Sequence, residues 1–191
     1  MNLRVAGYVA LGLAAVALIA ARIQGLESPT EDHGPPFALV DARTGQPFTQ
    51  DTLYGQPTAM FFGFTSCPEI CPTTLARITT YVKKLGRDAD KIRFAFVTVD
   101  PERDTAERMK AYVEAFSPRI VGLTGTRAEI DRTIARFGVF AKKIPSGDDY
   151  TYDHTAVLLL VDRAGMTTGT ADPHDAPEDE VMTKLRGLIA R

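Results

Sequence analysis

The sequence contains only two cysteines, Cys67 and Cys71, which stand four positions apart in the segment Ser-Cys-Pro-Glu-Ile-Cys-Pro. A buried strand is predicted just before them and a helix just after them, with Pro72 in its first turn. Positions i and i+4 of a helix have Cβ atoms about 5 to 6 Å apart, so both sulfurs can reach one point. A helix N-terminus also favours the thiolate, the form that binds metals or attacks disulfides. We therefore expect a metal site or a redox site here, rather than two inert buried cysteines.

A metal held by these cysteines would need a third donor. Zinc prefers four ligands, whereas two thiolates suit the soft ion Cu(I), which accepts three or fewer donors. The chain has three histidines: His33 in a polar N-terminal segment, His174 in an acidic loop, and His154 beside the predicted core. We expect His154 in a loop that enters the next strand, with Asp153 orienting its imidazole. The residues alone leave open that His154 is an ordinary surface histidine.

The elements that must position these residues follow an alternating pattern. Apolar runs and Gly-containing turns predict strands at 37–40, 47–49, 58–64, 92–99, 120–123, 156–161 and 166–170, with 139–144 extended. Apolar residues at spacings of three and four predict helices at 72–86, 105–116, 127–137 and 178–190. The alternation indicates a layered α/β domain.

The N-terminal run 5–21 has no charged or strongly polar residue and would form about 25 Å of helix, close to the thickness of a bilayer core. We expect a membrane anchor at 1–23, a linker at 24–36 and one domain at 37–191. Arg4 precedes the run and acidic residues follow it, which favours a cytoplasmic N-terminus. A cleaved signal peptide is the alternative, because Ala15-Val16-Ala17 could be a cleavage site.

Composition excludes several other classes of protein. With 45% hydrophobic and 24% charged residues, the 191-residue chain is globular rather than disordered, and its length suits one core. The formal net charge is -2 and basic residues form no dense cluster, so no nucleic acid partner is expected.

Three ordered blocks resemble the Sco/SenC family of copper-binding, membrane-tethered proteins, over roughly 36–190. The blocks are Phe-Phe-Gly-Phe-Thr-Ser-Cys-Pro-Glu-Ile-Cys-Pro at 61–72, Val-Thr-Val-Asp-Pro-Glu-Arg-Asp-Thr at 97–105, and Tyr-Asp-His-Thr at 152–155. The resemblance implies a thioredoxin-like fold, with a central mixed sheet flanked by helices. It also implies copper ligation by Cys67, Cys71 and His154. Glu69 stands where many members carry Asp, at a position not needed as a ligand.

The same resemblance implies a task, which is to deliver copper to the dinuclear copper site of cytochrome c oxidase subunit II. The expected partners are that subunit, an upstream copper donor protein and the membrane. Cu(I) is the expected form, with Cu(II) left open. An Arg- and Ser-rich transit sequence is not recognisable, which favours a bacterial inner membrane with the domain in the periplasm. No chemical role is evident for 100–105, beyond a helix cap by Asp104 or Thr105.

The alternative function is a thiol-disulfide oxidoreductase that keeps the cysteines of that copper site reduced. It ranks lower because thioredoxin-type reductants have two residues between their cysteines and a proline just before the strand that corresponds to 156–161. A peroxidase with Cys67 as the attacking thiolate is a further alternative. In an oxidising compartment the two cysteines could form a disulfide, so copper loading should require prior reduction. We therefore expect a metallochaperone rather than a true enzyme.

Overall fold

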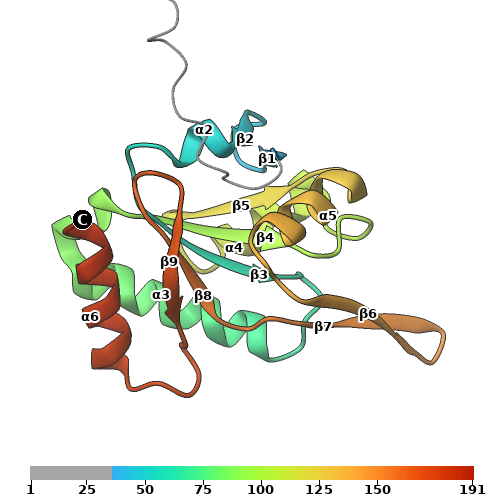
Figure 1. Cartoon of the computed structure of the whole chain (residues 1–191). Coiled ribbons are helices and arrows are strands. Elements are labelled where there is room, and N and C mark those ends of the chain that lie inside the picture. Colours follow the sequence, from blue (N-terminus) through green and yellow to red (C-terminus); the bar gives the residue numbers. More distant parts are fainter. Residues whose placement is uncertain (1–35) are drawn as a thin grey trace, which may run out of the picture. The chain divides into compact units, whose positions relative to one another are not determined.

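The structure, a computed structural model, describes residues 36–191 (Figure 1). The predicted anchor at 1–23 lies outside the described residues, as does nearly all of the predicted linker. Within 36–191, no helix combines the length and the apolar character that crossing a membrane requires.

A seven-stranded mixed sheet organises the described part of the chain, in the order β2-β1-β5-β4-β3-β8-β9. Its strands are β1 (Ala38–Asp41), β2 (Pro47–Thr49), β3 (Thr58–Gly63), β4 (Arg93–Thr98), β5 (Ile120–Thr124), β8 (Leu158–Val161) and β9 (Thr167–Ala171). The neighbours β3, β4 and β5 run parallel, and the other pairs are antiparallel. All residues of β3 are buried, because it lies between β4 and β8 and is covered on both faces.

Helices cover both faces of this sheet. They are α2 (Gln50–Leu53), α3 (Ile70–Leu85), α4 (Ala106–Glu114), α5 (Arg127–Arg136) and α6 (Glu178–Ile189), with a 3₁₀ helix, η1 (Gly86–Lys91). Alternate residues of β3 face opposite cores: Phe61 packs with buried residues of α3, α4 and α6, whereas Met60 and Phe62 pack with those of α2 and α5. The predicted helices and strands of the sheet are thus confirmed, whereas the short helices α2 and η1 were not predicted.

A second, two-stranded sheet carries the third candidate ligand. Strands β6 (Ala141–Ser146) and β7 (Asp149–His154) pair antiparallel with each other, and in Figure 1 this β6–β7 hairpin projects from the larger sheet. The expectation that His154 lies in a loop is therefore wrong, because it is the last residue of β7. Pro145 and charged residues interrupt the apolar pattern here, but a two-stranded ribbon with free edges tolerates them.

Candidate metal centre

The turn that carries Cys67 is fixed by a buried carboxylate. Asp104, which is fully buried, accepts hydrogen bonds from the Thr65 amide (3.0 Å), the Thr65 hydroxyl (2.5 Å) and the Thr98 hydroxyl (2.6 Å). Arg108 donates from outside to the Thr65 hydroxyl at 2.7 Å and to the Ser66 hydroxyl at 2.9 Å. The strand end and the cysteine turn are therefore tied to the segment that precedes α4.

This arrangement gives two neighbouring residues of the 100–105 block separate roles. Thr105 is the N-cap of α4, and its side chain accepts from the Arg108 amide at 3.3 Å, as predicted. Asp104 does not cap the helix, because its oxygens bind the cysteine turn and Thr98 instead. The predicted cap is confirmed for Thr105 only.

The two cysteines meet at the start of α3. Because the helix begins at Ile70, Cys67 precedes it rather than sharing a helical face with Cys71. The Cys71 amide donates to Cys67 Sγ at 3.4 Å, so this sulfur satisfies one of the free N–H groups at the helix start. Cys71 is fully buried and its sulfur lies against Gly63, whereas Cys67 is half-buried. Both are free thiols.

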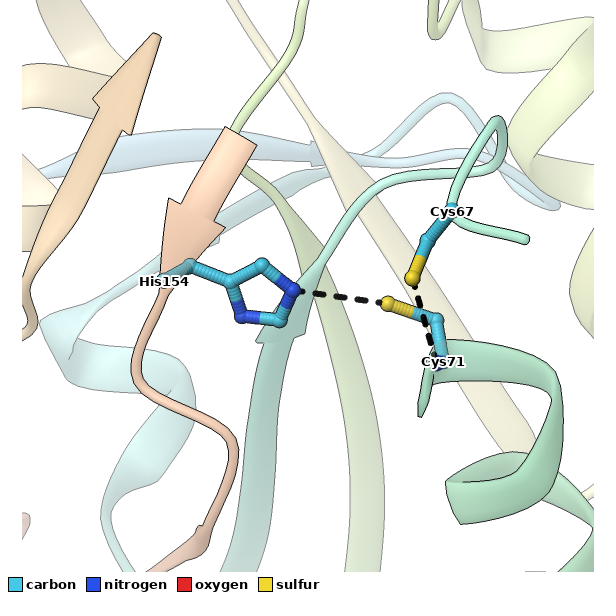
Figure 2. A group of neighbouring side chains, drawn as sticks. All are labelled: Cys67, Cys71 and His154. Atoms are coloured by element: carbon cyan, nitrogen blue, oxygen red, sulfur yellow. Dashed lines mark hydrogen bonds between the residues drawn. The ribbon is translucent and has the colours of Figure 1, made fainter. Parts of the chain in front are cut away.

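His154 approaches the cysteine pair from the β6–β7 hairpin, as Figure 2 shows. Its Nε2 lies 3.6 Å from Cys71 Sγ, and its Nδ1 lies 3.0 Å from the Thr155 carbonyl oxygen. A carbonyl only accepts, so Nδ1 carries a proton in this contact, and Nε2 is the ring nitrogen that faces the sulfurs. Edge-on contacts with Phe61 and Phe64 hold the ring in this orientation.

The expectation that Asp153 orients His154 is wrong. Successive side chains of a strand alternate between its two faces, and Asp153 is exposed. The backbone carbonyl of Thr155 orients the ring instead. Every residue has a backbone carbonyl, so residue type gives no sign of which one accepts this hydrogen bond, and the sequence could not reveal it.

Among the described residues, the other histidine, His174, does not join this group. His174 Nε2 lies 2.7 Å from the Thr74 hydroxyl, which places its loop on α3. His33 lies outside the described residues. The two sulfurs and His154 Nε2, in contrast, all lie within 4.8 Å of one another. The three predicted ligands are therefore brought together in one place.

The cysteine pair is electrostatically asymmetric. The side-chain hydrogen bond from the Cys71 thiol lowers the pKa of the Cys67 thiol well below its ordinary value, against the effect of burial and with a smaller contribution from His154. The same bond between the two sulfurs, together with burial, raises the pKa of Cys71. We infer that at neutral pH Cys67 is the thiolate and Cys71 retains the proton.

An open cavity of about 260 Å³ gives access to the half-buried ligands. It is lined by Phe64, Cys67, Pro68, Glu69, Ile70, Thr151, Tyr152, Asp153, His154 and Ala156. Cys67 and His154 are therefore accessible from the cavity, whereas buried Cys71 does not line it.

The donor set fits a soft metal ion with three ligands. Metal–sulfur bonds of about 2.3 Å and a metal–nitrogen bond of about 2.0 Å in a trigonal plane place the donors roughly 3.7 to 4.0 Å apart. The observed distance of 3.6 Å between Cys71 Sγ and His154 Nε2 is close to this range, and all three donor atoms lie within 4.8 Å of one another. Two thiolates and one imidazole are the donors that monovalent copper prefers.

Fold and site together define a thioredoxin-like α/β protein with a Cys₂His metal centre. The SCO1/SenC family model matches residues 26–190, and the chain belongs to this family. The solved structure of Bradyrhizobium japonicum ScoI with copper bound is similar, with 42% identity and a TM-score of 0.75, over 81% of this chain and 98% of that one.

Two curated relatives show the same affiliation. A SCO2-like protein of Rickettsia prowazekii is 41% identical over 135 residues, which cover 69% of this chain and 65% of that protein. The human mitochondrial SCO1 homolog is 37% identical over 132 residues, covering 67% of this chain and 44% of the relative. The matched region thus spans less than two thirds of each relative's length.

Proposed function

We propose that this chain is a copper metallochaperone that binds one Cu(I) ion through Cys67 Sγ, Cys71 Sγ and His154 Nε2. The observation that carries the proposal is the convergence of these three atoms within 4.8 Å beside an open cavity. The similarity to ScoI, whose structure contains copper, supports copper as the ion.

The geometry suits transfer by ligand exchange. Two thiolates, a neutral imidazole and Cu(I) carry a summed charge of -1, which the start of α3 tolerates because a helix N-terminus favours negative charge. Loading the site releases the proton held by Cys71. An acceptor thiolate can approach through the cavity beside half-buried Cys67, and each new metal–sulfur bond can replace one bond to this chain.

We further propose that the acceptor is the dinuclear copper site of cytochrome c oxidase subunit II, and that a separate donor protein loads the chain. Membership of the SCO1/SenC family supports this task. The proposed location is a bacterial inner membrane, with 1–23 as a single-pass anchor and the domain in the periplasm. An anchored chaperone would find a membrane-bound acceptor by a search in two dimensions.

Copper titration of the reduced full chain tests the ligand set. In competition with a chromophoric Cu(I) chelator, we expect one Cu(I) per chain, loss of tight binding in Cys67→Ser and Cys71→Ser, and weaker binding in His154→Ala. His174→Ala is the matched control, because His174 contacts α3 but not the cysteine pair, and it should bind as the wild type does. Equal affinity in all four variants would refute the proposal.

Delivery requires its own measurement. Mixing the Cu(I)-loaded chain with the reduced copper-binding domain of subunit II should move copper to that domain, as seen by metal analysis after separation. Copper that stays with the chain despite a large excess of acceptor would contradict the proposed destination, while leaving the ligand set intact.

Thiol-disulfide exchange is the second candidate, favoured by one observation. Half-buried Cys67, with its lowered pKa, can attack a disulfide, and buried Cys71 can then resolve the mixed disulfide. The products would be a reduced acceptor and a Cys67–Cys71 disulfide, with two electrons supplied by this chain. Against it, Thr155-Ala156-Val157 precedes β8 without a proline. Rapid insulin reduction without copper would favour this candidate.

A further inference from the structure

The β6–β7 hairpin supplies one copper ligand but shares no strand pairing with the large sheet in the described part of the chain. Backbone pairing inside the hairpin, from Ala141 opposite His154 to Ser146 opposite Asp149, fixes its own shape. Side-chain contacts, together with the short connections to α5 and β8, therefore set its position relative to the cysteines.

One face of β7 makes these contacts. Tyr150, Tyr152 and His154 alternate along the strand and share the face that meets the rest of the domain. The Tyr150 hydroxyl donates to Asp100 at 2.9 Å, and the Tyr152 hydroxyl accepts from Arg127 at 3.2 Å. The third residue of the series is the candidate ligand, so whatever holds the two tyrosines also sets the reach of the imidazole.

Arg103 contacts both Tyr150 and Asp149 of the hairpin. Its guanidinium carbon lies 3.8 Å from the centre of the Tyr150 ring, and Nη1 donates to the Tyr150 carbonyl at 3.1 Å and to Asp149 at 3.1 Å. Its Nε donates to fully buried Asp100, which anchors the arginine to the segment after β4. One planar group thus joins the body of the domain to β7.

The contacts of Arg103 continue to the ligand. The guanidinium lies 5.9 Å from the centre of the Phe64 ring, and Phe64 contacts both Tyr152 and His154. Phe64 directly precedes the cysteine turn, so Arg103 lies where the hairpin, the turn and the 100–105 block meet. The Arg103 side chain is only 20% exposed, and its Nη2 is enclosed.

We propose that Arg103 is a positioning residue that holds the β6–β7 hairpin so that His154 Nε2 stays within reach of the two sulfurs. The inference rests on the proposed copper function. It assigns a role to a residue of the 97–105 block for which the sequence indicates no chemistry. Movement of the hairpin away from Arg103 would withdraw the imidazole and leave the ion on the two cysteines.

Arg103→Lys is the sharpest test. Lysine keeps a positive charge beside buried Asp100. Its ammonium group is not planar, however, so it cannot stack on the Tyr150 ring while it donates to the Tyr150 carbonyl and to Asp149 as the guanidinium does. Arg119→Lys is the matched control, because Arg119 pairs with exposed Asp90 on another part of the surface. Tyr150→Leu keeps the Asp100–Arg103 pair but removes the stacked ring and the hydroxyl that donates to Asp100, which provides a second variant should Arg103→Lys fold poorly.

The measurement is the Cu(I) affinity of the reduced full chain by chelator competition. Each variant is measured twice, once with His154 present and once combined with His154→Ala. We expect Arg103→Lys to weaken binding about tenfold when His154 is present, the effect typical of residues that orient a ligand, and less than twofold when it is absent. Amide hydrogen exchange of the metal-free chain should accelerate at 150–154 and stay unchanged in α6.

The outcomes separate the two proposals. Equal weakening with and without His154, or no weakening at all in Arg103→Lys and Tyr150→Leu, would overturn the positioning role. Unchanged exchange at 150–154 in both variants would overturn it as well. Unchanged affinity in His154→Ala alone would instead refute the copper ligand set, because that result does not involve Arg103.

Discussion

Gly63→Ala tests whether the cysteine site depends on close packing behind it. Gly63 ends β3, and a methyl group added to it would lie 2.6 Å from Cys71 Sγ and 2.8 Å from Phe96 Cε2. Ordinary contacts begin at 3.4 Å, so the sulfur would have to move by about 0.8 Å. Overpacking of this kind typically costs about 1 to 3 kcal/mol of unfolding free energy.

The displacement should also weaken copper binding, because Cys71 is a proposed ligand and its sulfur lies 3.6 Å from His154 Nε2. We expect affinity to fall about tenfold, equivalent to about 1.4 kcal/mol. Urea unfolding and Cu(I) chelator competition on the reduced full chain measure the two effects separately.

Gly187→Ala is the control for this experiment. Gly187 is exposed in α6, and a methyl group there meets no atom within 4 Å. Alanine should stabilise that helix by about 0.5 to 1 kcal/mol and leave copper affinity unchanged. The reasoning fails if Gly63→Ala keeps both the unfolding midpoint and the affinity of the wild type.

Three further predictions concern the groups around the site. Iodoacetamide at neutral pH should alkylate Cys67 at least about tenfold faster than Cys71, because Cys67 is more accessible and has the lower pKa; peptide mass spectrometry reads the order, and equal rates would contradict it. Asp104→Ala should cost about 2 to 4 kcal/mol in urea unfolding, since it leaves Thr65 and Thr98 donors without their acceptor; an unchanged midpoint would contradict this role. The hydrogen bond from Arg127 lowers the pKa of Glu102 to about 2, so its stabilisation is complete above the ordinary pKa and is lost as pH falls toward 2. Glu102→Gln should therefore flatten the acid dependence of urea stability by less than about 1 kcal/mol, because the pair is largely exposed.

Most of the sheet could be predicted because its sequence signals are local and strong. The run that became β3 is apolar at nearly every position, as expected of a strand covered on both faces, and the helix after Cys71 shows a regular apolar spacing. The sequence predicts only one strand of the hairpin around Gly147, as an extended segment at 139–144, because 149–154 is polar and its strand pairs with 141–146 alone. Its stability depends on tyrosine contacts with distant arginines, which no local pattern encodes.

In the site, too, local sequence signals are predictable and long-range contacts are not. The spacing of the cysteines and the choice of His154 could be inferred from residue types together with the family resemblance, and the three side chains do converge. The groups that orient these three side chains could not be inferred in this way. Asp104 lies near its partner Thr98 but reaches a turn far away in the sequence, and the Thr155 carbonyl is a backbone atom. Residues that act through tertiary contacts leave no spacing rule to detect.

The bond from the Cys71 amide to Cys67 Sγ makes a sulfur atom part of the end of α3. An anionic sulfur accepts that N–H well, whereas a sulfur bonded in a disulfide has lost its negative charge and is a weak acceptor. Oxidation of the pair should therefore loosen the first turn of the helix as well as remove two ligands. We expect the Cys71 amide to exchange with solvent faster in the oxidised chain. The redox state of the cysteine pair would then change the local stability of the backbone at the start of α3.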